Sequence, residues 1–263
     1  MSKIPGVVTG VVKSVEDPDQ QGRVQISLPY LGGQNDSTWA PVATLMTGGG
    51  RGSWFMPEVG DEVLVAFNQE DVQHPYIIGF LWNGQDKPPV KNPDISTKVR
   101  RIRTVSGHQI DFDDIDGEEK ITITTKGGHK ILMDDTPGSG NVTISTNGGH
   151  KINMDDTPGA TGVSINTTGS QEIKLQDLPP SVTIQTTAQN QIIVSDVPPG
   201  ITINAPTGIL DVTCMMANVT ANSALNVNAP ITIFEGVVQA QTVIATAVVA
   251  SAYTPAPGDT FGL

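Results

Sequence analysis

The sequence predicts an all-β protein with two unlike parts, a small N-terminal barrel and a long repetitive C-terminal part. Only 37% of the 263 residues are hydrophobic and 5% are aromatic, which is too little for one deep core over the whole length. The 28 glycines, the 19 prolines and the abundance of Val, Ile and Thr favour strands and tight turns. The second half also contains a repeat of about 20 residues, which is typical of stacked β-structure.

The first part, residues 1–90, contains short segments of strand composition separated by turn residues. These segments are Gly6–Val12, Arg23–Leu28, Thr38–Val42, Glu62–Phe67 and His74–Phe80. Five strands in this length predict a small barrel, and its core is expected to include the three tryptophans, Trp39, Trp54 and Trp82. Residues 91–106, which follow a proline-rich run, are expected to form a neck or linker.

The second part, residues 107–208, is built from copies of one pattern. Three copies begin with a Gly-His pair, at Gly107, Gly128 and Gly149, and two weaker copies begin at Ser170 and Gln189. An aspartate recurs at positions 114, 135, 156, 177 and 196, with spacings of 21, 21, 21 and 19 residues. This period indicates stacked structural repeats, and residues 209–263 are expected to continue them as a distal β-helix and tip.

Each copy carries two segments in which apolar and polar side chains alternate. Ile131 and Met133 share one face, whereas Lys130, Leu132 and Asp134 share the other. A unit of this size cannot bury its apolar face alone, so it needs neighbouring units or other chains. A single-chain solenoid and three chains wound around one axis both meet this need. The two segments per copy favour the intertwined trimeric β-helix, or β-prism, which also removes exposed strand edges.

Charge and cysteine content restrict the partners and the compartment. The formal net charge is -12, of which -11 falls in residues 104–263, so nucleic acid is not expected as a partner. The lone cysteine, Cys214, and an N-terminus without a secretory signal predict assembly in a reducing cytoplasm. Polar residues interrupt the low-charge run Ile231–Tyr253, so it does not read as a membrane-spanning helix.

Three segments of the first part carry a resemblance to a known family. They are GVVKSVEDPDQQGRVQI at Gly10–Ile26, MPEVGDEVLVAF at Met56–Phe67 and HPYIIGFLWNG at His74–Gly84. In this order they resemble phage baseplate assembly protein V and the spike domain of type VI secretion VgrG proteins. The resemblance implies an N-terminal OB-fold barrel that trimerises beneath a hub protein, followed by a triple-stranded β-helix needle.

The resemblance also implies partners, and the chain departs from the larger relatives in ways that modify them. The 263 residues leave no room for a fused hub domain, and no lysozyme-like domain is expected between barrel and needle. A separate hub protein is therefore expected, with the inner tube as an indirect partner. The metal-bearing tips of the family carry a His-x-His pair, which is absent here. A separate PAAR-like tip protein is therefore expected at the C-terminal end, in preference to a blunt, self-capped tip.

The histidines of the repeat form one candidate site. His108, His129 and His150 recur every 21 residues, with Gln171 and Asn190 in the same column. In a trimer these side chains could form rings that hold an anion, water or a metal ion on the axis. The alternative, that Gly-His is the exposed end of a turn, is favoured, so no metal site or cofactor is expected.

The aspartate pairs at 113/114, 134/135 and 155/156 invite a calcium interpretation, because calcium prefers oxygen ligands. Calcium-binding solenoids, however, repeat about every nine residues with paired glycines. The Asp-Asp-Thr-Pro-Gly context is more typical of a turn in which one aspartate faces solvent. The sequence therefore favours a structural role for these pairs.

Other polar clusters also favour structural roles. The glycine-rich loop Thr47–Trp54 lacks the Gly-Lys-Ser/Thr ending that grips phosphate, so it is expected to contact another barrel or the hub. Cys214 has no nearby histidine, and no catalytic set is recognisable. The cluster Lys98, Arg100, Arg101 and Arg103 is expected to pair with Asp111, Asp113 or neighbouring-chain carboxylates, with an acidic hub surface as the alternative.

Taken with the resemblance, these features predict a non-enzymatic central spike of a contractile injection machine. It would be part of a phage tail baseplate, a pyocin-like particle or a secretion system, and would meet the target membrane only transiently. A trimeric receptor-binding or adhesin fibre is the first alternative, although it leaves the family segments unexplained. A single-chain β-helix enzyme acting on carbohydrate is the second, and it would need clustered carboxylates in a cleft.

Overall fold

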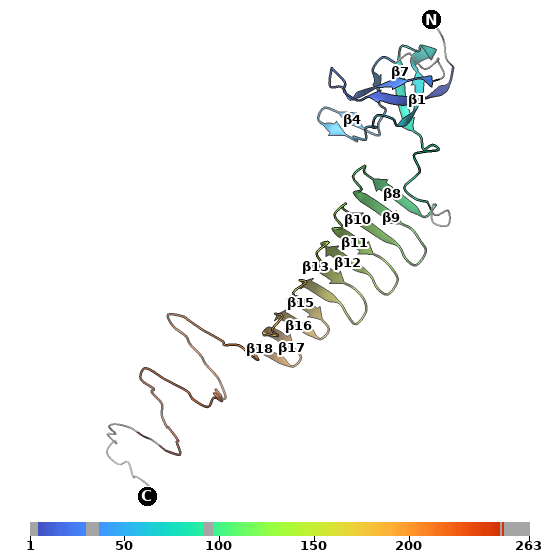
Figure 1. Cartoon of the computed structure of the whole chain (residues 1–263). Helices are drawn as coiled ribbons and strands as arrows, with labels where there is room; N and C mark the ends of the chain where they lie inside the picture. The colour runs from blue at the N-terminus through green and yellow to red at the C-terminus, as the bar shows by residue number, and fades with distance from the viewer. Residues whose placement is uncertain (1–4, 30–36, 92–96, 248, 250–263) are drawn as a thin grey trace. The chain divides into compact units, whose positions relative to one another are not determined.

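The computed structural model describes residues 5–29, 37–91, 97–247 and 249 (Figure 1). These residues form strands, turns and extended chain, with a short 3-10 helix at Asn68–Glu70. The all-β prediction is therefore confirmed. Two compact units divide at residue 210, and within the first unit a barrel and a long sheet are separate structures.

The barrel is a five-stranded antiparallel sheet with the strand order β3-β2-β1-β6-β7. A parallel bridge between Val42 and Ile77 joins its two edges, and the Ala43 N–H donates to the Ile77 carbonyl at 2.8 Å. This bridge closes the sheet into the predicted barrel. Its strands are β1 Val7–Ser14, β2 Arg23–Ser27, β3 Ala40–Pro41, β6 Glu62–Phe67 and β7 Pro75–Phe80.

The core of the barrel is aliphatic. Alternate residues of the strands point inward and are almost fully buried: Val12, Val24, Ile26, Leu28, Ala40, Val63, Val65 and Ile77. The expectation that all three tryptophans supply this core was wrong, because Trp54 is 73% exposed and Trp82 is 69% exposed. The small branched side chains fill a barrel of five short strands, and both indoles are left on its surface.

The repeats form one antiparallel meander of eleven strands, in which each strand pairs with its neighbours in sequence. The first strand, β8 Val99–Arg103, lies within the segment expected to be a neck. The others are β9 Gln109–Asp113, β10 Lys120–Thr124, β11 Lys130–Asp134, β12 Asn141–Ser145, β13 Lys151–Asp155, β14 Gly162–Asn166, β15 Glu172–Asp177, β16 Pro180–Gln185, β17 Gln191–Asp196 and β18 Pro199–Asn204.

The register of the meander aligns identical positions of the repeat. One column across the sheet consists of an isoleucine from every strand: Ile102, Ile110, Ile123, Ile131, Ile144, Ile152, Ile165, Ile173, Ile184, Ile192 and Ile203. A second column on the same face is apolar from Phe112 to Ile201 and begins with Arg100 on the edge strand. The opposite face is mainly polar, as Thr143, Asn153 and Ser164 illustrate.

Beyond β18 the structure changes character. Residues 206–247 are exposed, and no strand is assigned among them. After the turn in which the Gly208 N–H donates to the Ala205 carbonyl, the described residues form no backbone hydrogen bonds with one another. This distal stretch therefore contrasts with the meander, whose strands are paired within the chain. Of the predicted distal β-helix and tip, residues 209–263, positions 248 and 250–263 lie outside the described residues.

Candidate functional site

The apolar face of the meander is an unpartnered surface of the described chain. Most of its isoleucines are at least 36% exposed, from 36% at Ile131 to 73% at Ile201, although the strands β9 to β17 are paired on both sides. Monomeric proteins rarely leave a continuous apolar patch of this extent open to water. A sheet with one such face needs a second layer, so this face is the main candidate interaction surface.

The aspartate pairs lie in turns at one edge of the sheet. The Oδ1 atoms of Asp134 and Asp155 accept the backbone N–H groups of Thr136 and Thr157, at 3.0 and 2.9 Å. The hydrogen bonds from Thr136 hold the pKa of Asp134 below its ordinary value, and those from Thr157 do the same for Asp155. The described residues contain no group of three acidic, His or Cys side chains suited to a metal ion. The hydrogen bonds from Thr136 and Thr157 are those of a turn, as the Asp-Asp-Thr-Pro-Gly pattern predicted.

The histidines lie in the turns at the other edge. The Lys126 N–H donates to Nδ1 of His108, and the Asn147 N–H donates to Nδ1 of His129, both at 3.3 Å. Successive histidines are two strands apart, which is about 10 Å at the usual strand spacing. Two histidines of one chain are therefore too far apart to share a metal ion. An axial site would need one histidine from each of several chains.

The basic cluster pairs with acidic residues of the same chain. Arg101 binds Asp111 through two hydrogen bonds, at 2.7 and 2.9 Å, and Arg100 contacts Asp114. Lys98 contacts Asp116 at 2.8 Å. Asp111 was among the expected partners, whereas Asp114 and Asp116 were not named. Because most of these pairs are exposed, each contributes little to stability.

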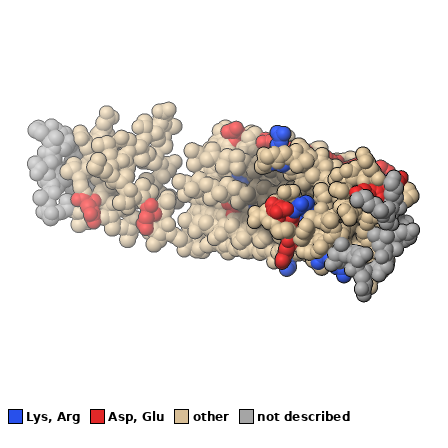
Figure 2. All heavy atoms as spheres, turned by 90° about the horizontal axis from the view of Figure 1, so that it is seen from above, with Lys and Arg blue, Asp and Glu red and all other residues tan. Residues whose placement is uncertain are grey.

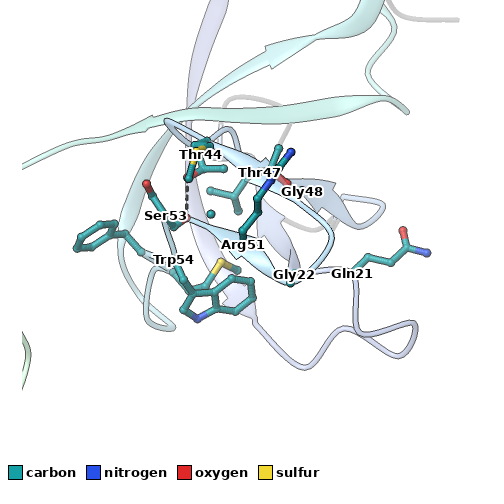
Figure 3. A pocket seen from close by; sticks show the side chains of 14 residues that line it. Gln21, Gly22, Thr44, Thr47, Gly48, Arg51, Ser53 and Trp54 are labelled. Atoms are coloured by element: carbon teal, nitrogen blue, oxygen red, sulfur yellow. Dashed lines mark hydrogen bonds between the residues drawn. The ribbon is translucent and has the colours of Figure 1, made fainter.

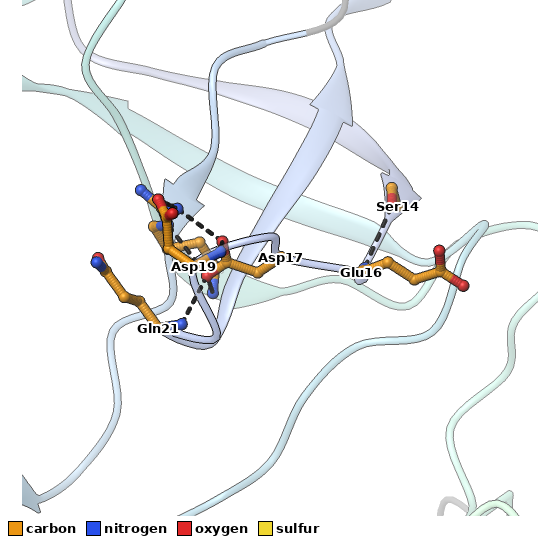
Figure 4. Close-up of polar contacts among 6 residues, drawn as sticks. Ser14, Glu16, Asp17, Asp19 and Gln21 are labelled. Atoms are coloured by element: carbon orange, nitrogen blue, oxygen red, sulfur yellow. Dashed lines mark hydrogen bonds and ion pairs between the residues drawn. The ribbon is translucent and has the colours of Figure 1, made fainter.

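The loop between β1 and β2 is organised by one carboxylate (Figure 4). Asp17 accepts backbone N–H groups from Asp19, Gln21 and Arg23, at 3.1, 2.8 and 3.2 Å. It also binds Nε and Nη2 of the Arg23 guanidinium, at 3.1 and 2.6 Å. Its side chain is only 4% exposed, and the Arg23 guanidinium holds the pKa of Asp17 well below its ordinary value. The Asp-Pro-Asp motif is therefore a rigid loop.

The glycine-rich loop forms a β-hairpin, which packs against the loop between β1 and β2 (Figure 3). Its strands are β4 Thr47–Gly48 and β5 Arg51–Gly52, and the Thr44 hydroxyl donates to the Ser53 carbonyl at 2.6 Å. The Trp54 ring packs on Gly22 so closely that a Cβ added there would lie 2.9 Å from it. A shallow hollow of about 450 Å³ lies between the hairpin and the loop.

The hairpin has an apolar surface that sequence reasoning missed. Leu45 is 95% exposed, and Met46, Trp54 and Phe55 are also mostly open to water. The signal was present, since four large apolar residues flank a run of glycines too short to bury them. Cys214 is exposed in the distal stretch, where the described residues provide no histidine or carboxylate cluster beside it.

The barrel, which occupies the first third of the chain, identifies the class of protein to which this part of the chain is similar. Residues 8–82 match the family described as the type VI secretion system and phage-baseplate injector OB domain. The matched segment contains all five strands of the barrel except the first residue of β1. The OB-fold prediction is therefore confirmed.

Individual relatives include type VI secretion spike proteins. Spike protein VgrG3 of Vibrio cholerae is 33% identical over 113 residues, which are 40% of this chain and 11% of that protein. Spike protein VgrG5 of Pseudomonas aeruginosa is 31% identical over 126 residues, 44% of this chain and 16% of that protein. The actin cross-linking toxin VgrG1 of Vibrio cholerae is 32% identical over 111 residues, 39% of this chain and 10% of the toxin.

The chain is thus VgrG-like over its N-terminal part, as the resemblance predicted, and it spans a small fraction of the length of these relatives. The comparisons favour a structural role in a baseplate or spike. No helix among the described residues is long and apolar enough to cross a membrane.

Proposed function

We propose that the protein is the central spike of a contractile injection machine, driven as a trimer into a target envelope when a sheath contracts. The observation that carries this proposal is the combination of an injector OB domain with an eleven-stranded sheet whose apolar face is open. The OB domain supports attachment to a baseplate. The sheet supports an elongated shaft, because three such faces can meet around one axis.

The trimer follows from the need to cover the apolar face. Complete burial of each partly exposed isoleucine would stabilise the assembly by on the order of 1 kcal/mol of free energy. Because the backbone of β9 to β17 is paired on both sides within the chain, other copies would cover this face through side chains alone. In the repeats, therefore, three separate sheets would pack face to face as a β-prism.

The distal stretch supports a second kind of contact between copies. Its apolar residues, such as Ile209, Val212 and Met215, are exposed, and its backbone groups have no partners within the described chain. Unpaired backbone groups are rare in folded segments. Strands contributed by other copies would supply the missing hydrogen bonds, so the intertwined winding is proposed for residues 209–263.

The charge distribution suits a shaft that enters a membrane. Residues 205–247 contain Asp211 and Glu235 as their only charged side chains, and Figure 2 shows this stretch without a basic residue. Entry into lipid would therefore desolvate few charges. Resistance to buckling would come from the continuous hydrogen-bonded ladder and the stacked apolar columns.

The proposed role determines the partners and the location. A hub protein would bind the barrels, a PAAR-like protein would cap the distal end, and the inner tube would be reached through the hub. The trimer would assemble in the cytoplasm and become part of a virion tail baseplate or injection particle. The role is structural, and the toxin activity named for VgrG1 belongs to a protein of which this chain matches only 10%.

Native mass spectrometry tests the proposal. We expect a mass of about 83 kDa, three times the 27.7 kDa chain. Co-purification with a hub protein then distinguishes a spike from a receptor-binding fibre. A stable monomer at micromolar concentration would rule out the shaft, because its apolar face would then be tolerated in water.

A further inference from the structure

A second hollow, the seam hollow, lies on the outer surface of the barrel where the sheet closes. Strand β2 pairs with β3, and β3 leads into the bridge that joins it to β7. Ala40 and Ile77 point into the core, so Trp39 and Tyr76, which precede them, point outward, and both line the hollow. Its volume of about 470 Å³ lies in the range of small-molecule sites, roughly 300–1,000 Å³.

The loop before β7 holds one side of the seam hollow in place. The Thr38 hydroxyl donates to the Gln73 carbonyl at 2.8 Å, and the Gln73 N–H donates to Oδ1 of Asp71 at 3.0 Å. Nδ1 of His74 lies 3.1 Å from Oδ2 of Asp71. Because a carboxylate only accepts hydrogen bonds, Nδ1 of the neutral ring donates, and Nε2 is left as an acceptor. A wall fixed in this way loses little conformational entropy on binding.

The seam hollow combines aromatic surface with polar groups that have no partner. Trp39 is half-buried and Tyr76 is 42% exposed. Several polar groups of its lining residues make no hydrogen bond within the described chain: the indole N–H of Trp39, the hydroxyl of Tyr76 and the side-chain amides of Gln21 and Gln73. Together with Nε2 of His74, these groups offer both donors and acceptors beside two aromatic rings.

The charges at the seam hollow exclude an anionic ligand. Among the described residues that line it, Arg23 is the only Lys or Arg. Its guanidinium is already bound by Asp17 and Asp19, each at 2.6 Å, and one positive with two negative charges gives this group a net charge of -1. A nucleic acid or another polyanion needs unpaired Lys or Arg side chains at its anionic groups. The seam hollow therefore suits an uncharged ligand.

We infer that the seam hollow binds a short, uncharged saccharide, with a sugar ring against Trp39 and Tyr76 and its hydroxyl groups paired with the surrounding polar side chains. Sugar hydroxyls both donate and accept, as the lining groups do. The C–H groups of a sugar ring match the negative face of an aromatic ring. The hollow also lies over β2, β3 and the loops β1–β2 and β6–β7, which are the part of the OB barrel that can bind oligosaccharides.

A proline-rich peptide is the alternative ligand, because aromatic rings also line the grooves that bind polyproline II helices. Proline has no backbone N–H, so such a peptide offers mainly carbonyl acceptors. It would leave Nε2 of His74 and the amide oxygens of Gln21 and Gln73 without donors. These acceptors favour a saccharide over the peptide.

Isothermal titration calorimetry of the full-length protein tests the inference, with chitotriose, cellotriose and maltotriose as uncharged probes. We expect at least one of them to bind, and Y76A to weaken that binding at least roughly tenfold. Y76F keeps the ring and should weaken it less. The matched control is F80A, which removes a ring of similar exposure, 49%, from the same strand but outside the hollow. It should bind as the parent does, and thermal melts verify that all three variants are folded.

The inference would be overturned by the absence of binding heat with all three probes at millimolar concentration, or by equal weakening in Y76A and F80A. Binding of a decaproline peptide or of heparin in place of the uncharged sugars would also overturn it. The seam hollow is formed by one chain, so none of these results bears on the spike. Conversely, a monomer that binds sugar through Tyr76 would refute the proposed function and leave the saccharide site intact.

Discussion

At the scale of single residues, Asp17 shows how one buried carboxylate can fix a loop. It combines three backbone N–H groups with a two-point contact to the Arg23 guanidinium. Charge-assisted hydrogen bonds of this kind are about twice as strong as neutral ones. The loop in turn supports Gly22, on which Trp54 rests. Asp17 thus positions the hairpin of the barrel through Gly22.

We predict that Asp17→Asn lowers the melting temperature of the barrel by several degrees, because the amide cannot accept both the guanidinium and the backbone donors. The folded pKa of Asp17 lies below its ordinary value of 3.8. Its stabilising effect is therefore complete above about pH 4 and is lost as the pH falls toward the folded pKa. Thermal melts between pH 2 and 7 should show this loss in the parent protein and less of it in the variant.

The matched control is Asp19→Asn, since Asp19 has an exposed side chain whose hydrogen bond among the described residues goes to the Arg23 guanidinium. It should melt within about a degree or two of the parent. Equal decreases in melting temperature in the two variants would mean that Asp17 contributes no more to stability than an exposed surface charge.

At this scale the sequence predicted strand positions and turns correctly, but it did not predict which side chains are buried. Alternation is a local property, so Glu62–Phe67 was predicted as a strand with the bounds that the structure has. The burial of Trp54 and Trp82 was predicted wrongly, because hydrophobicity alone does not say which face of a barrel a side chain occupies. The apolar hairpin surface was missed for the same reason. Turn residues such as Asp134 were predicted well, since their hydrogen bonds reach only two positions along the chain.

At the scale of elements, the repeat specifies a strand pair and the face of each side chain. It does not specify which chain supplies the next strand. The single-chain meander from β8 to β18 resolves this point for the repeats, because short turns bring consecutive strands together at little entropic cost. The two columns on the apolar face then follow from the regular register.

We predict that Ile152→Asp prevents assembly of the repeats, because the carboxylate would be buried without a partner between three apolar faces. The neighbouring Asn153→Asp adds the same charge on the opposite face of β13 and serves as the control. Native mass and thermal melts should show a monomer, or a trimer melting at least about 10 °C lower, for the first variant only. If neither substitution changes the assembly state or the melting temperature, the Ile column faces solvent in the functional protein.

At the scale of the whole molecule, the described chain differs from part to part in how its backbone groups and apolar faces find partners. The barrel closes on itself through Val42 and Ile77, the meander pairs within the chain but leaves a face open, and the distal stretch pairs with nothing. In the proposed trimer, the dependence of each part on other copies would therefore rise along the sequence. The proposed trimer should be held by side chains in the repeats and by backbone ladders near the tip.

This gradient predicts the behaviour of a chain that ends at Asn204. The shortened protein should still form a trimer, since the apolar face of β8 to β18 is retained, but it should dissociate faster in denaturant, because ladders shared between chains cannot separate without unwinding. Native mass gives the assembly state, and subunit exchange between tagged and untagged trimers gives the rate, which we expect to rise at least roughly tenfold. The full-length protein, and a chain ending at 247, are the controls. If the chain ending at Asn204 is monomeric, the distal stretch alone holds the copies together, and the Ile column contributes too little to assemble them.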